Sequence, residues 1–248
     1  MQAMIGLSAF TAVRWFAGEV ESDVDERSIM RLPSRIVTRH LRASESQAIA
    51  VTAAAIEKGE LVVFPTDTLY GVGTNAFDEQ AILRLYAAKE RPLTKGIPIL
   101  LADLGDIDNV ACSVPDIALK LISRFWPGPL TLIVPKHPDL PKSISEDDSV
   151  AVRIPDCDVA RAVIRAAGGA VATSSANRSG NAAAQTAEQA LIELDGEVTI
   201  VLDAGPTGQA VPSTIVDCMG ETMRILRHGP IKLHELKSID ASIAWVNF

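Results

Sequence analysis

Residues 61–101 read LVVFPTDTLYGVGTNAFDEQAILRLYAAKERPLTKGIPILL, and this stretch indicates the fold class. Leu61–Phe64 is short and apolar, which predicts a buried strand, and Pro65 ends it because proline has no backbone N–H to donate. A helix is predicted over Asp78–Ala88, with the aspartate as its N-cap, and a second strand over Ile97–Leu101. Strand, helix and strand in succession are typical of an α/β fold.

The connection after the first strand is rich in polar side chains. It carries, in order, Thr66, Asp67, Thr68 and Tyr70. Glycines follow at positions 71 and 73, where we expect the backbone to turn sharply or to approach a ligand closely. In open α/β sheets ligands bind at the carboxyl ends of strands, so these groups are candidates for a binding site. Asp67 is either an acid of that site or the cap of its own turn.

Basic residues follow the helix at Lys89, Arg91 and Lys95. Guanidinium and ammonium groups donate charge-assisted hydrogen bonds to phosphate oxygens. The stretch as a whole therefore predicts a small polar ligand that binds beside a phosphate group.

The rest of the chain alternates in the same way, and its last two strands are predicted to pair antiparallel. Helices are expected over Ser44–Lys58, Asp116–Phe125, Asp158–Ala167, Ala187–Leu194 and Ile231–Ser238. Strands are expected over Leu130–Val134, Val150–Ile154, Ala170–Ser174, Thr199–Leu202, Ser213–Asp217 and Met223–Leu226. We predict an α/β fold over residues 30–248: a single domain whose twisted mixed β-sheet is flanked by helices.

The composition excludes several classes of protein. A net charge of −8 argues against a protein that coats nucleic acid, which needs a broad basic surface. The 3 cysteines are far apart and form no zinc-like cluster, which favours a reduced, cytoplasmic setting. No apolar run reaches the roughly 18 residues of a membrane span. Residues 1–29 lack the basic start of a signal peptide and are predicted to be an extension outside the domain.

Polar residues recur at the ends of the later strands. They are Ser149, Arg153, Thr173, Ser175, Asn177, Ser213 and Arg227. No Ser-His-Asp arrangement or metal-ligand cluster accompanies them, because the 4 histidines are scattered. Cations and hydroxyls without a nucleophile fit chemistry that works by positioning and by neutralising phosphate charge, such as adenylyl transfer.

Several motifs together resemble the threonylcarbamoyl-AMP synthase family, the YrdC-like proteins, over roughly Ser44 to Pro230. They are PTDTLYG from Pro65, KERP from Lys89, FWPGPLTL from Phe125, VAVRIPD from Val150, SANRSG from Ser175, STIVD from Ser213 and ILRHG from Ile225. Because the chain ends at Phe248, it is similar to the single-domain form of this family.

The resemblance implies a reaction in which L-threonine, bicarbonate and ATP give threonylcarbamoyl-AMP and pyrophosphate. Other proteins would transfer the threonylcarbamoyl group to adenosine 37 of tRNA. It also implies a concave, positively charged cavity, Mg²⁺ accompanying the ATP, and a possible tRNA contact.

Roles follow position by position from the same resemblance. Lys89 and Arg91 would be catalytic. L-threonine would be bound by Thr68, Arg153, Thr173 and Ser213, and ATP by Arg91, Lys95, Ser149, Ser175, Asn177 and Arg227. Gly96 and Ala183 depart from the family pattern, which has proline and serine there. The alternatives are an RNA-binding accessory protein and a YrdC-like paralogue with another nucleotide-dependent activity.

Overall fold

The structure is a computed structural model that describes residues 36–208, 210–220 and 222–245. It contains an 11-stranded sheet with the strand order β1-β8-β2-β3-β7-β4-β6-β5-β9-β10-β11. The predicted extension, residues 1–29, lies outside the described residues. None of the helices in the described ranges is long and apolar enough to cross a membrane.

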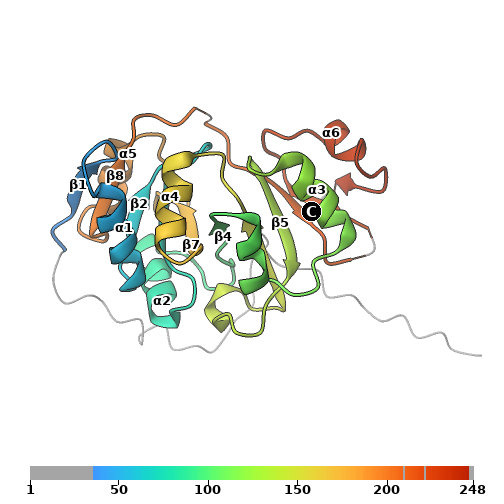
Figure 1. The fold of residues 1–248 in the computed structure, drawn as a ribbon, viewed down its shortest axis with the longest axis horizontal. Coiled ribbons are helices and arrows are strands. Elements are labelled where there is room, and N and C mark those ends of the chain that lie inside the picture. Colours follow the sequence, from blue (N-terminus) through green and yellow to red (C-terminus); the bar gives the residue numbers. More distant parts are fainter. Residues whose placement is uncertain (1–35, 209, 221, 246–248) are drawn as a thin grey trace, which may run out of the picture.

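The strands are short and the helices lie between them along the chain (Figure 1). The strands are β1 (Arg39–Arg42), β2 (Val62–Phe64), β3 (Gly71–Asn75), β4 (Ile99–Leu101), β5 (Leu130–Pro135), β6 (Ser149–Arg153), β7 (Ala170–Ser175), β8 (Ile200–Asp203), β9 (Thr214–Asp217), β10 (Arg224–Arg227) and β11 (Ala244–Trp245). The α-helices are α1 (Ala48–Glu57), α2 (Glu79–Lys89), α3 (Asp116–Phe125), α4 (Asp158–Ala166), α5 (Ala187–Leu194) and α6 (Leu233–Lys237). Two 3₁₀ helices are η2 (Leu104–Asn109) and η3 (Lys142–Ile144).

The sheet is mixed, as the sequence predicted. Strand β2 pairs parallel with β8 and antiparallel with β3, and β9 pairs antiparallel with β10. Strand β6 pairs parallel with β4 and antiparallel with β5. The strand ends that carry polar residues therefore come from different parts of the chain but lie along one sheet.

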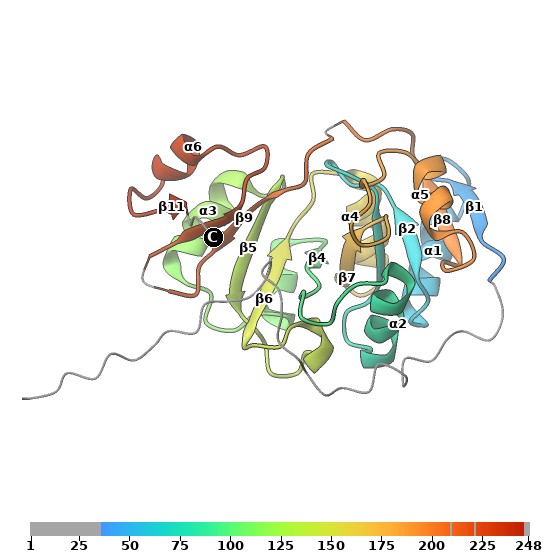
Figure 2. The same cartoon turned by 180° about the vertical axis from the view of Figure 1, so that it is seen from behind.

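Helices cover both faces of the sheet. Alternate residues of β2 face opposite layers: Val62 and Phe64 pack with α1 and α4, whereas Val63 packs in the cluster that contains α2 and α5. Figure 1 shows α1 and α4 in front of the strands, and Figure 2 shows α2 and α5 from the opposite side. Because both faces are covered, β2 is apolar throughout rather than alternating.

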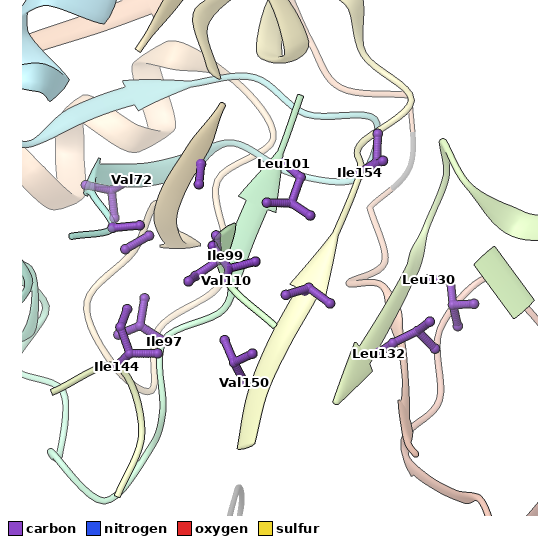
Figure 3. Close-up of a cluster of buried hydrophobic side chains, with 14 of the residues drawn as sticks. Val72, Ile97, Ile99, Leu101, Val110, Leu130, Leu132, Ile144, Val150 and Ile154 are labelled. Carbon is purple, nitrogen blue, oxygen red and sulfur yellow. The ribbon is translucent and has the colours of Figure 1, made fainter. Parts of the chain in front are cut away.

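The larger core cluster joins the central strands to the loops beside them (Figure 3). Val72, Ile99 and Val150 come from three strands and are fully buried. Ile97 and Ile144 approach them from the connections that precede β4 and β6, where the Ile97 N–H donates to the Ile144 carbonyl (2.8 Å). This packing fixes the chain that runs from α2 into β4, which borders the cavity described below.

The structure corrects one of the two alternatives predicted for positions 71 and 73, the sharp turn, whereas Gly71 does line the cavity described below. Gly71 and Gly73 do not turn the chain sharply, because both lie in strand β3. A β-carbon on Gly73 would lie 2.8 Å from Cγ1 of Val171 and 3.0 Å from Cε1 of Phe64. Glycine is therefore needed for close packing inside the sheet. The sequence also missed β1, β3, β11 and the 3₁₀ helices η2 and η3, and α1 begins later than the predicted Ser44.

Gly73→Ala is expected to lower the free energy of unfolding by about 1–3 kcal/mol, because the added methyl group overpacks the sheet. Urea denaturation measures the effect. Gly105→Ala is the control, since a β-carbon there meets nothing within 4 Å. Equal unfolding midpoints for both variants would contradict the packing described for β3.

Candidate active site

A cavity of about 190 Å³ opens where the polar strand ends meet. It is lined by residues from the β2–β3 connection, the loop after α2, the ends of β6, β7 and β10, and the starts of β5 and β9. Predicted site residues in the lining are Thr68, Arg91, Arg153, Thr173, Ser175, Ser213 and Arg227. Among the described residues that line it, three are arginines and none is Asp or Glu.

The β2–β3 connection is held by Thr66. Its hydroxyl accepts the N–H groups of Thr68 (3.2 Å) and Leu69 (3.2 Å) and donates to the Leu69 carbonyl (2.6 Å). Thr66 and Thr68 hydroxyls also lie within hydrogen-bond distance (3.1 Å). Thr66 therefore organises this turn, and Asp67 is not needed as its cap.

Arg153 stands at the end of β6 with three hydrogen bonds. It donates from Nε to the Gly128 carbonyl (2.9 Å), from Nη1 to the Thr68 hydroxyl (3.0 Å) and from Nη2 to Asp67 Oδ1 (2.5 Å). The Arg153 and Asp67 side chains are only 6% and 11% exposed. The guanidinium is therefore held in one orientation at the cavity wall.

Arg91 is fixed by the loop that follows it. Its Nε donates to the Lys95 carbonyl (3.0 Å) and its Nη2 to the Gly96 carbonyl (2.9 Å). The hydroxyl of Tyr86 donates to the same Lys95 carbonyl (3.1 Å). The backbone of this loop thus orients Arg91, while the Lys95 side chain is outside the lining of the cavity.

Arg227 is joined to Ser213 across the β9–β10 pair. Its Nε donates to the Ser213 carbonyl (2.9 Å) and its Nη2 to the Ser213 hydroxyl (3.0 Å). The Ser213 hydroxyl is also 2.7 Å from the Thr131 hydroxyl, which comes from β5. Thr131 lines the cavity but was not among the predicted residues, because a threonine inside an apolar strand gives no separate signal.

Burial lowers the pKa values of the three arginines, and repulsion between arginines adds to this shift for Arg227 alone. Burial is the largest cause for each. The pKa of Arg227 falls to about 10, and the charges of Arg153 and Arg91 contribute to that shift. All three guanidinium groups remain charged at neutral pH, so they place positive charge together in a partly dry site.

Lys89 is buried and does not belong to the lining of the cavity. Its ammonium donates to the backbone carbonyls of Ser175 and Asn177, and its own carbonyl accepts the N–H of Ser179 (2.8 Å). Ser175 ends β7 and lines the cavity, so Lys89 supports the end of that strand and the loop that follows it. Burial, with repulsion from Arg91 second, lowers the pKa of Lys89 to about 7.

Two residues that were predicted to bind ATP are also absent from the lining of the cavity. Ser149 begins β6, roughly 13 Å along the strand from Arg153 at its other end, and its hydroxyl donates to Asp147 (2.6 Å). Asn177 is buried, and its amide donates to the carbonyls of Arg178 (2.9 Å) and Asn181 (2.7 Å). In this structure both side chains hold loops.

The low pKa of Lys89 predicts a pH effect on stability. Its folded pKa is below its unfolded value, so the unfolded chain holds an extra proton between about pH 7 and pH 10.5. Stability from this group therefore rises with pH in that window, by roughly 1 kcal/mol per pH unit. Urea denaturation of wild type and Lys89→Met between pH 7 and 9 isolates the effect, and parallel pH dependences would contradict it.

The mixed sheet and the arginine-lined cavity define an α/β domain with a small basic site at its strand ends. A family model described as "Telomere recombination", Sua5/YciO/YrdC, matches residues 54–229. The chain therefore belongs to the Sua5/YciO/YrdC family, as its motifs predicted.

Two relatives illustrate the similarity. A *Bacillus subtilis* protein named threonylcarbamoyl-AMP synthase is 38% identical over 205 residues, which cover 82% of this chain and 59% of the relative. A *Mycobacterium tuberculosis* protein named putative threonylcarbamoyl-AMP synthase is 40% identical over 201 residues, 79% of this chain and 92% of the relative. The chain thus spans about three fifths of the length of the first relative and most of the second.

Solved structures agree with the fold. *Pyrococcus abyssi* Sua5 complexed with L-threonine superposes with a TM-score of 0.81 at 34% identity, covering 85% of this chain and 62% of that one. *Escherichia coli* YciO superposes with a TM-score of 0.71 at 22% identity, covering 82% of this chain and 99% of that one. This similarity supports the fold alone.

Proposed function

We propose that this chain is a nucleotidyltransferase that makes threonylcarbamoyl-AMP and pyrophosphate from L-threonine, bicarbonate and ATP. The observation that carries the proposal is the cavity itself, where three arginines and several hydroxyls line the wall without an acid among the described lining residues. The names of the relatives and the L-threonine complex of *P. abyssi* Sua5 support it.

The chemistry requires positioning more than a protein nucleophile. The amino nitrogen of threonine attacks the carbon of bicarbonate with loss of water, and the resulting carbamate oxygen attacks the α-phosphorus of ATP while pyrophosphate leaves. Two anions must approach each other, so fixed positive charge in a partly dry site lowers the barrier. Arginines whose orientations are set by backbone carbonyls supply that charge without reorganising.

We propose that different residues of the cavity bind the two substrates. Arg153, Thr68 and Thr173 bind L-threonine on one side, with Ser213 and its partner Thr131 between the sides. Arg91, Arg227 and Ser175 bind the phosphates of ATP. Lys89 acts indirectly by holding the end of β7 at Ser175, and we assign no ligand contact to Ser149, Asn177 or the Lys95 side chain.

Mg²⁺ enters the proposal only with ATP. In the described part of the chain, no group of three or more His, Cys, Asp or Glu side chains is arranged to hold a metal ion. We therefore assign the ion no protein ligand; bound to ATP, it offsets phosphate charge.

The product would pass, in the cytoplasm, to proteins that transfer the threonylcarbamoyl group to adenosine 37 of tRNA. A direct contact with tRNA stays a prediction.

Pyrophosphate release from Mg-ATP tests this function. We expect release only when L-threonine and bicarbonate are both present. Pyrophosphate release that does not depend on L-threonine would indicate a paralogue with another substrate. No release, together with tRNA binding that survives physiological salt and is lost in Arg91→Ala, would indicate an RNA-binding accessory protein.

A further inference from the structure

Asp67 carries a mostly buried carboxylate, 11% exposed, that the proposed reaction does not yet use. It lies in the β2–β3 connection, 86 residues from its partner Arg153 at the end of β6. Its Oδ1 accepts from Arg153, and its Oδ2 is buried without a hydrogen-bond partner among the described residues. Because Thr66 holds the turn, the interaction of Asp67 is directed at Arg153.

The hydrogen bonds of Arg153 leave part of it available to a ligand. A guanidinium has five N–H donors. Three are used, by the Gly128 carbonyl, the Thr68 hydroxyl and Asp67. Each terminal nitrogen therefore keeps one donor without a protein acceptor in the described ranges. Arg153 lines the cavity and Asp67 does not, so a ligand meets the arginine while the carboxylate fixes it from behind.

The other two cavity arginines lack this arrangement. Within the described residues, Arg91 and Arg227 donate to carbonyl and hydroxyl oxygens and form no ion pair. They keep their full positive charge, whereas the charge of Arg153 is partly offset by Asp67. A polyphosphate is attracted to uncompensated charge more strongly than a single carboxylate is.

We propose that Asp67 is a positioning and specificity residue: it fixes Arg153 for the amino-acid carboxylate and keeps phosphate groups away from it. The two anionic substrates then bind to different arginines of one cavity. This inference rests on the proposed function, because it assumes that both substrates enter the cavity. It goes beyond that function because it assigns to the Asp67 carboxylate the task of keeping L-threonine and the phosphates of ATP on different arginines.

Asp67→Asn tests the inference, because asparagine keeps the size and an acceptor oxygen but removes the charge. We expect the KM for L-threonine to rise about tenfold, as for loss of a charge-assisted hydrogen bond. Inorganic tripolyphosphate should compete with ATP alone in the wild type and with both ATP and L-threonine in Asp67→Asn. Asp103→Asn is the control, since Asp103 pairs with Arg161 (2.8 Å) and Arg165 (2.7 Å) outside the cavity.

The outcomes separate the possible failures. A lower melting temperature with an unchanged KM and inhibition pattern would show that Asp67 is only structural. If Asp67→Asn does not fold, inhibition of the wild-type enzyme by tripolyphosphate still tests the inference. Inhibition that L-threonine relieves in the wild type would overturn it. Wild-type enzyme that releases no threonine-dependent pyrophosphate would instead refute the proposed function.

Discussion

Replacing Arg153 with alanine is expected to raise the KM for L-threonine by at least about 30-fold, while the KM for ATP changes by no more than about twofold. Two effects act in the same direction. The variant loses the donors that we assign to the amino-acid carboxylate, and it leaves the mostly buried charge of Asp67 without its partner. Steady-state pyrophosphate release with each substrate varied in turn measures both constants.

Arg165→Ala is the matched control for this variant. Arg165 lies on α4, is half exposed and pairs with Asp103 away from the cavity. Both KM values should stay near those of the wild type. An equal loss of affinity for L-threonine and ATP in Arg153→Ala, with a normal melting curve, would show that the cavity is divided wrongly.

Arg91→Ala is expected to lower kcat/KM for ATP by about 10²–10³, the usual cost of removing a preorganised group that stabilises charge in the transition state. L-threonine binding, measured by calorimetry without ATP, should persist. Arg91→Lys should recover only part of the activity, because lysine keeps the charge but cannot hold both the Lys95 and Gly96 carbonyls as the planar guanidinium does.

Arg84→Ala is the control, because Arg84 lies on α2, the helix that precedes the loop of Arg91. Arg84 donates to the Gly59 carbonyl (2.8 Å) and lies outside the cavity lining. Normal ATP kinetics in Arg91→Ala, together with reduced affinity for L-threonine, would reverse the assignment of the two sides.

Local patterns were enough to predict most of the fold. The apolar run at β2, the Asp78 cap of α2 and the antiparallel β9–β10 pair are all confirmed. The sharp turn at Gly73 was predicted wrongly, because glycine is required there by Val171 and Phe64, which the folded sheet places 2.8 Å and 3.0 Å from where a β-carbon would lie. Strand β1 was missed because RHLR is polar and pairs only at the edge of the sheet.

The candidate site was predicted in part for the same reason. Arg153 and Arg227 stand at strand ends, and strand ends can be read from sequence. The nucleotide role of Ser149 was implied by the family resemblance alone, and the structure places Ser149 at the start of β6, the end opposite Arg153. The pairing of Asp67 with Arg153 joins residues 86 positions apart, and three strands lie between β2 and β6 in the sheet, so no local pattern predicts it.

Mass spectrometry of the reaction with ¹³C-bicarbonate tests the central claim most directly. Incubation of the protein with Mg-ATP, L-threonine and labelled bicarbonate should give an adenylate whose carbamoyl carbon carries the label, and omission of any substrate should abolish it. AMP or ADP formed without a labelled threonyl adduct, under conditions where the protein is folded, would contradict the account.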